Sequence, residues 1–151
     1  MLPTEIHYLL TQHQEITMQL PHKIMAIIAL IFTVNSVYAL EKETYTQERF
    51  DVLQAAGEVV LIDVYASWCS TCKKQQDALA AYRTANPDSK FTILEIDFDK
   101  NKDLVRQFRA PRQSTLLIYK GNNQFWYSVA ESRLEVIAAE LDKAINFKPK
   151  S

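Results

Sequence analysis

A buried strand that runs directly into a helix constrains the fold of this chain more than any other feature. Residues 59–65 read Val-Val-Leu-Ile-Asp-Val-Tyr, and this density of β-branched and apolar residues predicts a strand buried on both faces of a sheet. The loop Ala66-Ser67-Trp68 follows, and the polar, Ala-rich residues from Cys69 to about Thr84 predict a helix that ends before Asn86-Pro87. A strand and a helix joined in this way indicate an α/β sheet.

The sequence after residue 40 supplies the other elements. Helices are predicted over residues 46–56, closed by Gly57, and over residues 102–108 and 132–145. Strands are predicted over residues 91–97, 115–120 and 124–129, the last two joined by the turn 121–123 as a hairpin. This order predicts an α/β fold with a central mixed β-sheet flanked by helices on both faces.

Cys69 and Cys72 are the only cysteines in the chain, and helical spacing places them one turn apart on one face. We expect Cys69 at the exposed start of the helix, where free N–H groups and the helix dipole favour a thiolate, and Cys72 shielded inside it. Cys69 would attack a disulfide and Cys72 would resolve the mixed disulfide. The alternative is a static bridge, which closes so small a loop that it adds little stability.

The composition disfavours several other functions. Every His (7, 13 and 22) and every Met (1, 18 and 25) precedes residue 39, so the two cysteines lack the partners that a zinc or copper site requires. We therefore expect no metal and no cofactor. Two glycines in the whole chain argue against a Gly-rich phosphate loop, and the balance of 16 basic and 16 acidic residues after residue 39 disfavours nucleic acid.

Residues 1–39 are predicted to be a signal peptide or an uncleaved N-terminal anchor, with residues 40–151 as the folded domain. The apolar run 24–34 follows His22-Lys23 and is short for a membrane span, which needs roughly 20 apolar residues. Val37-Tyr38-Ala39 fits cleavage after Ala39; an apolar helix of the fold is a further alternative. Residues 1–17 fit a signal poorly, so Met18 is the more natural start. A periplasmic or otherwise exported location follows, in which disulfides persist.

The stretch Asp63-Val-Tyr-Ala-Ser-Trp-Cys-Ser-Thr-Cys-Lys73 resembles the active site of the thioredoxin superfamily, and the resemblance runs from about Thr46 to Ile145. It implies a thioredoxin-like fold and a redox-active pair. Asp63 would be the buried carboxylate, with a raised pKa, that relays a proton to the resolving cysteine; the alternative is an Asp at a strand edge held by a backbone N–H. Trp68 would pack beside the cysteines as an apolar docking surface, or else serve as an ordinary core residue.

Three positions depart from that family's pattern. Ser114 stands at the cis-proline position before Thr115, so a trans peptide is expected, and the substrate-binding loop would be Gln113-Ser114, with the Ser114 hydroxyl near Cys69. Ser70-Thr71 replaces the common Gly-Pro pair, so the direction of electron flow is not implied. Glu95 occupies the place of a Lys near the buried Asp, where it would raise one carboxyl pKa or simply lie on the strand surface.

The resemblance favours a thiol-disulfide oxidoreductase, a monomer that takes electrons from a membrane thiol-disulfide donor and reduces disulfide-bonded protein substrates. An exported oxidase or isomerase with the same residues and a more oxidising pair is the second hypothesis. The third is a non-catalytic binding module whose disulfide is structural, a reading that Ser114 leaves open.

Overall fold

The computed structural model describes residues 40–148, which form a five-stranded mixed sheet with helices on both faces. The strands are β1 (Glu43–Thr44), β2 (Val59–Tyr65), β3 (Thr92–Asp97), β4 (Thr115–Lys120) and β5 (Asn123–Val129). The helices are α2 (Gln47–Ala55), α3 (Ser70–Ala85), α4 (Lys102–Gln107) and α5 (Leu134–Asn146). The sheet order is β1-β3-β2-β4-β5; β1, β3 and β2 run parallel, and β4 and β5 are antiparallel to their neighbours. The predicted fold class is confirmed.

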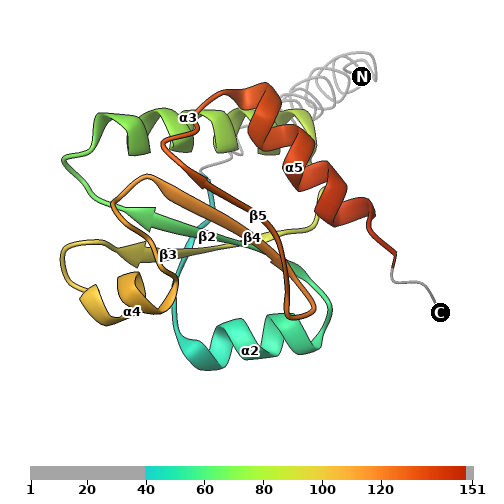
Figure 1. Ribbon diagram of the computed structural model, residues 1–151. Coiled ribbons are helices and arrows are strands. Elements are labelled where there is room, and N and C mark those ends of the chain that lie inside the picture. Colours follow the sequence, from blue (N-terminus) through green and yellow to red (C-terminus); the bar gives the residue numbers. More distant parts are fainter. Residues whose placement is uncertain (1–39, 149–151) are drawn as a thin grey trace, which may run out of the picture. The chain divides into compact units, whose positions relative to one another are not determined.

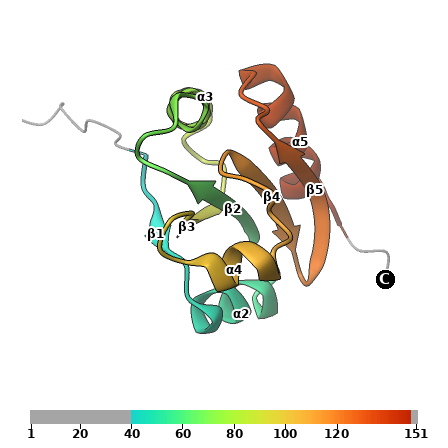
Figure 2. The same ribbon diagram turned by 60° about the vertical axis from the view of Figure 1, so that its left-hand side comes forward.

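The sheet separates two layers of helices. Helices α3 and α5 cover one face, and α2 and α4 cover the other (Figure 1; Figure 2). Because side chains alternate along a strand, β2 contributes to a core on each side. Val59 and Leu61 pack with α3 and α5, whereas Val60 and Ile62 pack with α2 and α4. Asp63 has the parity of Leu61 and therefore faces the α3 side of the sheet.

Local sequence explains how the elements around the site begin and end. Thr46 caps α2, its side chain accepting a hydrogen bond from the N–H of Arg49 at 3.1 Å. Gly57 follows that helix at a φ of +70°, a left-handed conformation that glycine adopts without a Cβ clash. After β2 the chain turns at once, and the N–H of Cys69 donates to the carbonyl of Ala66 at 3.1 Å. Cys69 thereby becomes the N-cap of α3.

Most predicted boundaries agree with the structure within two residues. The strand over residues 59–65 is reproduced in full and is buried along its length except at Tyr65. The final helix begins at Leu134 rather than at residue 132, and the preceding residues form the loop beside the site. The sequence reading missed β1, because two residues carry no detectable period; β1 extends the sheet beside β3.

The predictions for residues 1–39, including cleavage after Ala39 and a start at Met18, lie outside the described residues. Among residues 40–148, the helices are too short or too polar for any of them to traverse a lipid bilayer.

Candidate functional site

Cys69 lies at the end of the loop that joins β2 to α3, and its sulfur caps the N-terminus of α3. Its backbone is extended, with φ −90° and ψ 111°, and its Sγ accepts a hydrogen bond from the N–H of Cys72 at 3.1 Å. The Ser114 Oγ lies 3.0 Å from the same sulfur. The prediction of an exposed Cys69 is wrong: only 7% of the residue is accessible, and Ser114 contacts its sulfur. Cys72 is completely buried, so Cys69 is the more accessible thiol, as expected.

The two thiols are free and electrostatically unequal. Burial alone raises the pKa of Cys69, but hydrogen bonds from Cys72, Ser114 and backbone amides outweigh it and hold that pKa below its ordinary value. Burial raises the pKa of Cys72, and its hydrogen bond to Cys69 raises it further. When the pair loses one proton, that proton therefore leaves Cys69 rather than Cys72. This is the distribution that an attacking thiol and a resolving thiol require.

Asp63 is wholly buried in the central strand, with its carboxyl group under α3. Its Oδ2 accepts a hydrogen bond from Nε2 of Gln76, one turn beyond Cys72 on that helix, and its Oδ1 has no hydrogen-bond partner among the described residues. Burial raises the pKa of Asp63 to about 7; Lys42 and the hydrogen bond from Gln76 lower this pKa by less, and Glu95 raises it further. The alternative of a strand-edge Asp held by a backbone N–H is wrong, because β2 has a strand on each side. A carboxyl group with this pKa can take or give a proton near neutral pH.

Glu95 lies directly beside Asp63 in the register of β2 and β3. Its carboxylate pairs with Lys42, which precedes β1 and whose ammonium also lies 4.7 Å from the centre of the Tyr65 ring. Both interpretations of Glu95 hold in part, since it is partly exposed on the sheet and raises the pKa of Asp63, whereas Lys42 lowers that pKa. The positive charge next to the buried carboxyl thus comes from the segment before β1. No pattern in the sequence predicted this role of Lys42.

Ser114 occupies the loop before β4 with a left-handed backbone, at a φ of +63°. Its N–H donates to the carbonyl of Val64 at 2.9 Å, and its own carbonyl accepts from the N–H of Ala130 at 2.8 Å. The peptide bond before it is trans, as expected, and its hydroxyl lies beside the cysteines, as predicted. Gln113, the preceding residue, is half-buried. The substrate-binding role of these two residues stays a prediction.

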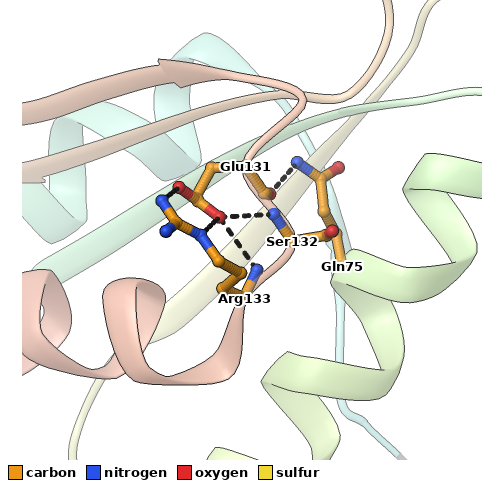
Figure 3. Close-up of polar contacts among 4 residues, drawn as sticks. All are labelled: Gln75, Glu131, Ser132 and Arg133. Atoms are coloured by element: carbon orange, nitrogen blue, oxygen red, sulfur yellow. Dashed lines mark hydrogen bonds and ion pairs between the residues drawn. The ribbon is translucent and has the colours of Figure 1, made fainter.

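Gln75 is a buried member of the site that the sequence analysis missed. Its Nε2 donates to the carbonyl of Ser114 at 3.1 Å and to that of Glu131 at 2.7 Å, joining α3 to two loops. Figure 3 shows the bond to Glu131. The carboxylate of Glu131 is held in turn by the backbone N–H groups of Ser132 and Arg133 and by the Arg133 guanidinium. The one available signal was position: Gln75 follows Cys72 by three residues, on the helix face that points to the sheet.

Trp68 precedes the cysteine pair and is 63% exposed, so the core-packing alternative is wrong. Its indole Nε1 donates to Oδ2 of Asp99 at 2.7 Å, which fixes one edge of the ring. The exposed ring beside Cys69 is an apolar surface available for contact. Across residues 40–148, His, Cys, Asp and Glu side chains nowhere gather in a group of three that could hold a metal ion.

Known proteins of the thioredoxin family are similar to this chain in sequence and in fold. The thioredoxin family model matches residues 37–143. The chain is 26% identical over 98 residues to thioredoxin from Alicyclobacillus acidocaldarius subsp. acidocaldarius, a match that covers 65% of this chain and 92% of that protein. It is 29% identical over 99 residues to the chloroplastic thioredoxin-like 2 of Oryza sativa subsp. japonica, and this match spans 65% of the chain but only 41% of the rice protein. The solved structure of Trxlp from Edwardsiella tarda EIB202 aligns with a TM-score of 0.62 at 32% identity, covering 67% of this chain and 98% of that one.

The matched region reaches from before β1 into α5, so it spans the whole sheet and not merely the two cysteines. A short motif can arise by chance, whereas this match extends over all five strands and over helices on both faces of the sheet. The chain belongs to the thioredoxin family.

Proposed function

We propose that this protein is an exported thiol-disulfide reductase that acts as a monomer on disulfide-bonded proteins. The observation that supports it best is the capping position of the Cys69 sulfur, which accepts hydrogen bonds where α3 begins. These hydrogen bonds favour the attacking thiolate, and the buried Cys72 is available for resolution one turn below.

The proposed reaction consists of two successive thiol–disulfide exchange steps. The Cys69 thiolate attacks one sulfur of the substrate disulfide, and the other substrate sulfur leaves as a thiolate that takes up a proton. Cys72 then loses its proton, for which Asp63 is the proposed acceptor, and attacks the Cys69 Sγ. The second substrate thiolate leaves, so two electrons have passed to the substrate and a Cys69–Cys72 disulfide remains. A membrane dithiol donor is proposed to reduce that disulfide again.

Trapping separates this function from that of a binding module with a structural bridge. In the full chain, Cys72→Ser leaves the attacking thiol without its resolving partner. We therefore expect this variant to form stable mixed disulfides with a disulfide-bonded probe protein such as insulin. Cys69→Ser should trap far less, because Cys72 is fully buried. Failure of Cys72→Ser to trap any partner, with Cys69 titrating near the ordinary thiol pKa of about 8.5, would support the binding module instead.

The reduction potential separates a reductase from an oxidase or isomerase. Equilibration of the wild-type pair with glutathione should give a value nearer to about −270 mV than to about −120 mV. A value at the oxidising end would replace the reductase proposal. The hydrogen bonds to the Cys69 sulfur favour the alternative of a more oxidising pair, because stabilising the reduced form raises the reduction potential.

Asp63 has a role of its own in this proposal. Asp63→Asn keeps the size of the side chain and removes the base, so it should slow resolution more than the first attack. Stopped-flow reduction of a fluorescent mixed disulfide reports the two steps separately. Equal slowing of both steps would remove Asp63 from proton transfer.

Export is proposed from residues 1–39. Expression of the full chain in a bacterium with a periplasm should yield a periplasmic form whose intact mass corresponds to an N-terminus at Leu40. A membrane-bound full-length form would replace the cleaved signal by the anchor, and a cytoplasmic full-length form would overturn export.

A further inference from the structure

The Ser114 hydroxyl lies between the two active sulfurs. Its oxygen is 3.0 Å from Sγ of Cys69 and 3.3 Å from Sγ of Cys72, and the residue is completely buried. A hydroxyl has one proton to donate and lone pairs with which to accept. When Cys69 is a thiolate and Cys72 a thiol, the Ser114 O–H can donate to the Cys69 thiolate. The S–H of Cys72 then donates either to the Ser114 oxygen or directly to Cys69, and in both cases the Ser114 proton is directed at the thiolate.

Contacts from neighbouring residues hold Ser114 in this position, because its backbone is not in a conformation that serine favours. A φ of +63° costs a residue with a Cβ free energy and persists only when its surroundings impose it. The N–H and the carbonyl of Ser114 are both engaged, the carbonyl by the Ala130 N–H and by Gln75. These bonds fix the direction of the side chain toward the sulfurs.

Gln75 supplies the part of this support that comes from a side chain. It is fully buried, and its two donated bonds connect α3, the Ser114 loop and the loop before α5. Figure 3 shows the bond to the loop before α5. The far carbonyl belongs to Glu131, whose own side chain is locked by Ser132 and Arg133. Gln75 therefore donates hydrogen bonds to two backbone segments that are each held by other contacts.

We propose that Ser114 is a catalytic residue whose hydroxyl stabilises the Cys69 thiolate, and that Gln75 is the positioning residue that keeps it there. The inference rests on the proposed dithiol chemistry of the same site. The oxidised pair carries no thiolate to receive this bond, so the bond favours the reduced form. It raises the reduction potential of the pair and lowers the basicity of Cys69.

Two substitutions that remove the hydroxyl but differ in backbone strain provide the test. Ser114→Gly suits the left-handed backbone, whereas Ser114→Ala keeps its strain, so the first variant should be the more stable of the two. Both should lose Cys69 thiolate about tenfold at a fixed pH below its pKa, as measured by the ultraviolet absorbance of the thiolate in the full chain. The equilibrium constant with glutathione should change by the same factor, which moves the potential down by about 30 mV.

A double-mutant cycle tests Gln75. Gln75→Leu should shift the thiolate titration in the same direction as Ser114→Gly but by less, and it should have no further effect in the Ser114→Gly background. A structural disturbance would act equally in both backgrounds. Ser128→Ala is the matched control, since this half-buried β5 serine makes no side-chain hydrogen bond among residues 40–148.

Three results would overturn the inference. The first is an unchanged Cys69 titration in Ser114→Gly. The second is a shift that follows stability, appearing in the Ala variant but not in the Gly variant. The third is an equal effect of Gln75→Leu with and without the hydroxyl. Each of these leaves the dithiol function standing if the wild-type protein reduces insulin, whereas a wild-type protein that neither reduces nor traps a disulfide removes the proposed function first.

Discussion

At the scale of the residue, the buried carboxyl of Asp63 makes stability depend on pH. Its pKa is about 7 in the fold and 3.8 as an ordinary side chain. Between these values the folded chain holds a proton that the unfolded chain releases, so this contribution is complete below about pH 4 and is lost as the pH rises through 7. Asp63→Asn cannot ionise, so above pH 7 it should be more stable than wild type by up to about 4 kcal/mol. Urea unfolding of the reduced proteins from pH 4 to 8 measures the difference.

The control for this prediction is Asp103→Asn, which alters an exposed carboxylate paired with Arg106 on α4. Its unfolding curve should follow the pH dependence of wild type, because exposed pairs contribute little. Wild type and Asp63→Asn curves that run parallel across the whole range would mean that Asp63 titrates normally in the folded state.

The charges beside Asp63 should tune its pKa in opposite directions. Lys42 lowers this pKa and Glu95 raises it. Lys42→Met should therefore raise the pKa of Asp63 and shift the pH dependence of the resolving step upward, and Glu95→Gln should shift it downward. Carbon-13 NMR titration of the Asp63 carboxyl, with the pH profile of resolution, measures both. Shifts of the same sign in the two variants would contradict the electrostatic account.

The sequence predicted the residues of this site whose roles depend on a motif or on a buried strand. Cys69, Cys72 and Asp63 lie where expected, and Ser114 was placed near the sulfurs by its position before β4. Gln75 was missed, since a polar residue in a polar helix carries no signal until the opposing backbone is known. The low exposure of Cys69 was missed for a similar reason, because it depends on how the Ser114 loop packs.

At the scale of the element, one lysine fastens the end of α5 to the sheet. The Nζ of Lys120, the last residue of β4, donates to the carbonyls of Ala144, Ile145 and Phe147 at 2.9, 3.0 and 2.9 Å. A helix C-terminus leaves carbonyls without partners and is favoured by a positive charge. Lys120→Met removes both, so the free energy of unfolding should fall by about 1–3 kcal/mol.

Lys143→Met is the control for that prediction, since this exposed α5 lysine pairs with Glu140 at the helix surface. It should change stability by less than about 1 kcal/mol in the same urea titration. Equal losses in the two variants would show that Lys120 acts as an ordinary surface charge and not as a cap.

Elements with a strong local pattern were predictable, and those defined by a partner were not. The apolar run of β2 and the Gly57 signal at the end of α2 were sufficient in sequence alone. The two residues of β1 become a strand only through their pairing with β3, and the start of α5 depends on the loop that Glu131 organises. Such elements have no internal period to detect.

At the scale of the whole molecule, the sheet separates two large apolar clusters, one on each of its faces. One part lies under α3 and α5, on the side where Asp63 meets Gln76. The other lies under α2 and α4 and includes Val64, the strand residue next to Asp63 on the opposite face. The cysteines form a small third cluster with Ala66, against which Phe98 packs, and Phe98 also packs against the second core.

This division predicts which core substitutions are independent. Ile62 and Ile93 belong to different cores, so Ile62→Val and Ile93→Val should each lower the free energy of unfolding by about 0.5–1.5 kcal/mol and add in the double variant within about 0.5 kcal/mol. Leu61 and Ile93 are opposite each other on the same face, so Leu61→Val combined with Ile93→Val should deviate from additivity, because each variant changes the cavity of the other. Urea unfolding of the three single and two double variants, beside wild type, measures the coupling. Strong coupling across the sheet, with additivity on one face, would mean that the sheet does not separate the two cores energetically.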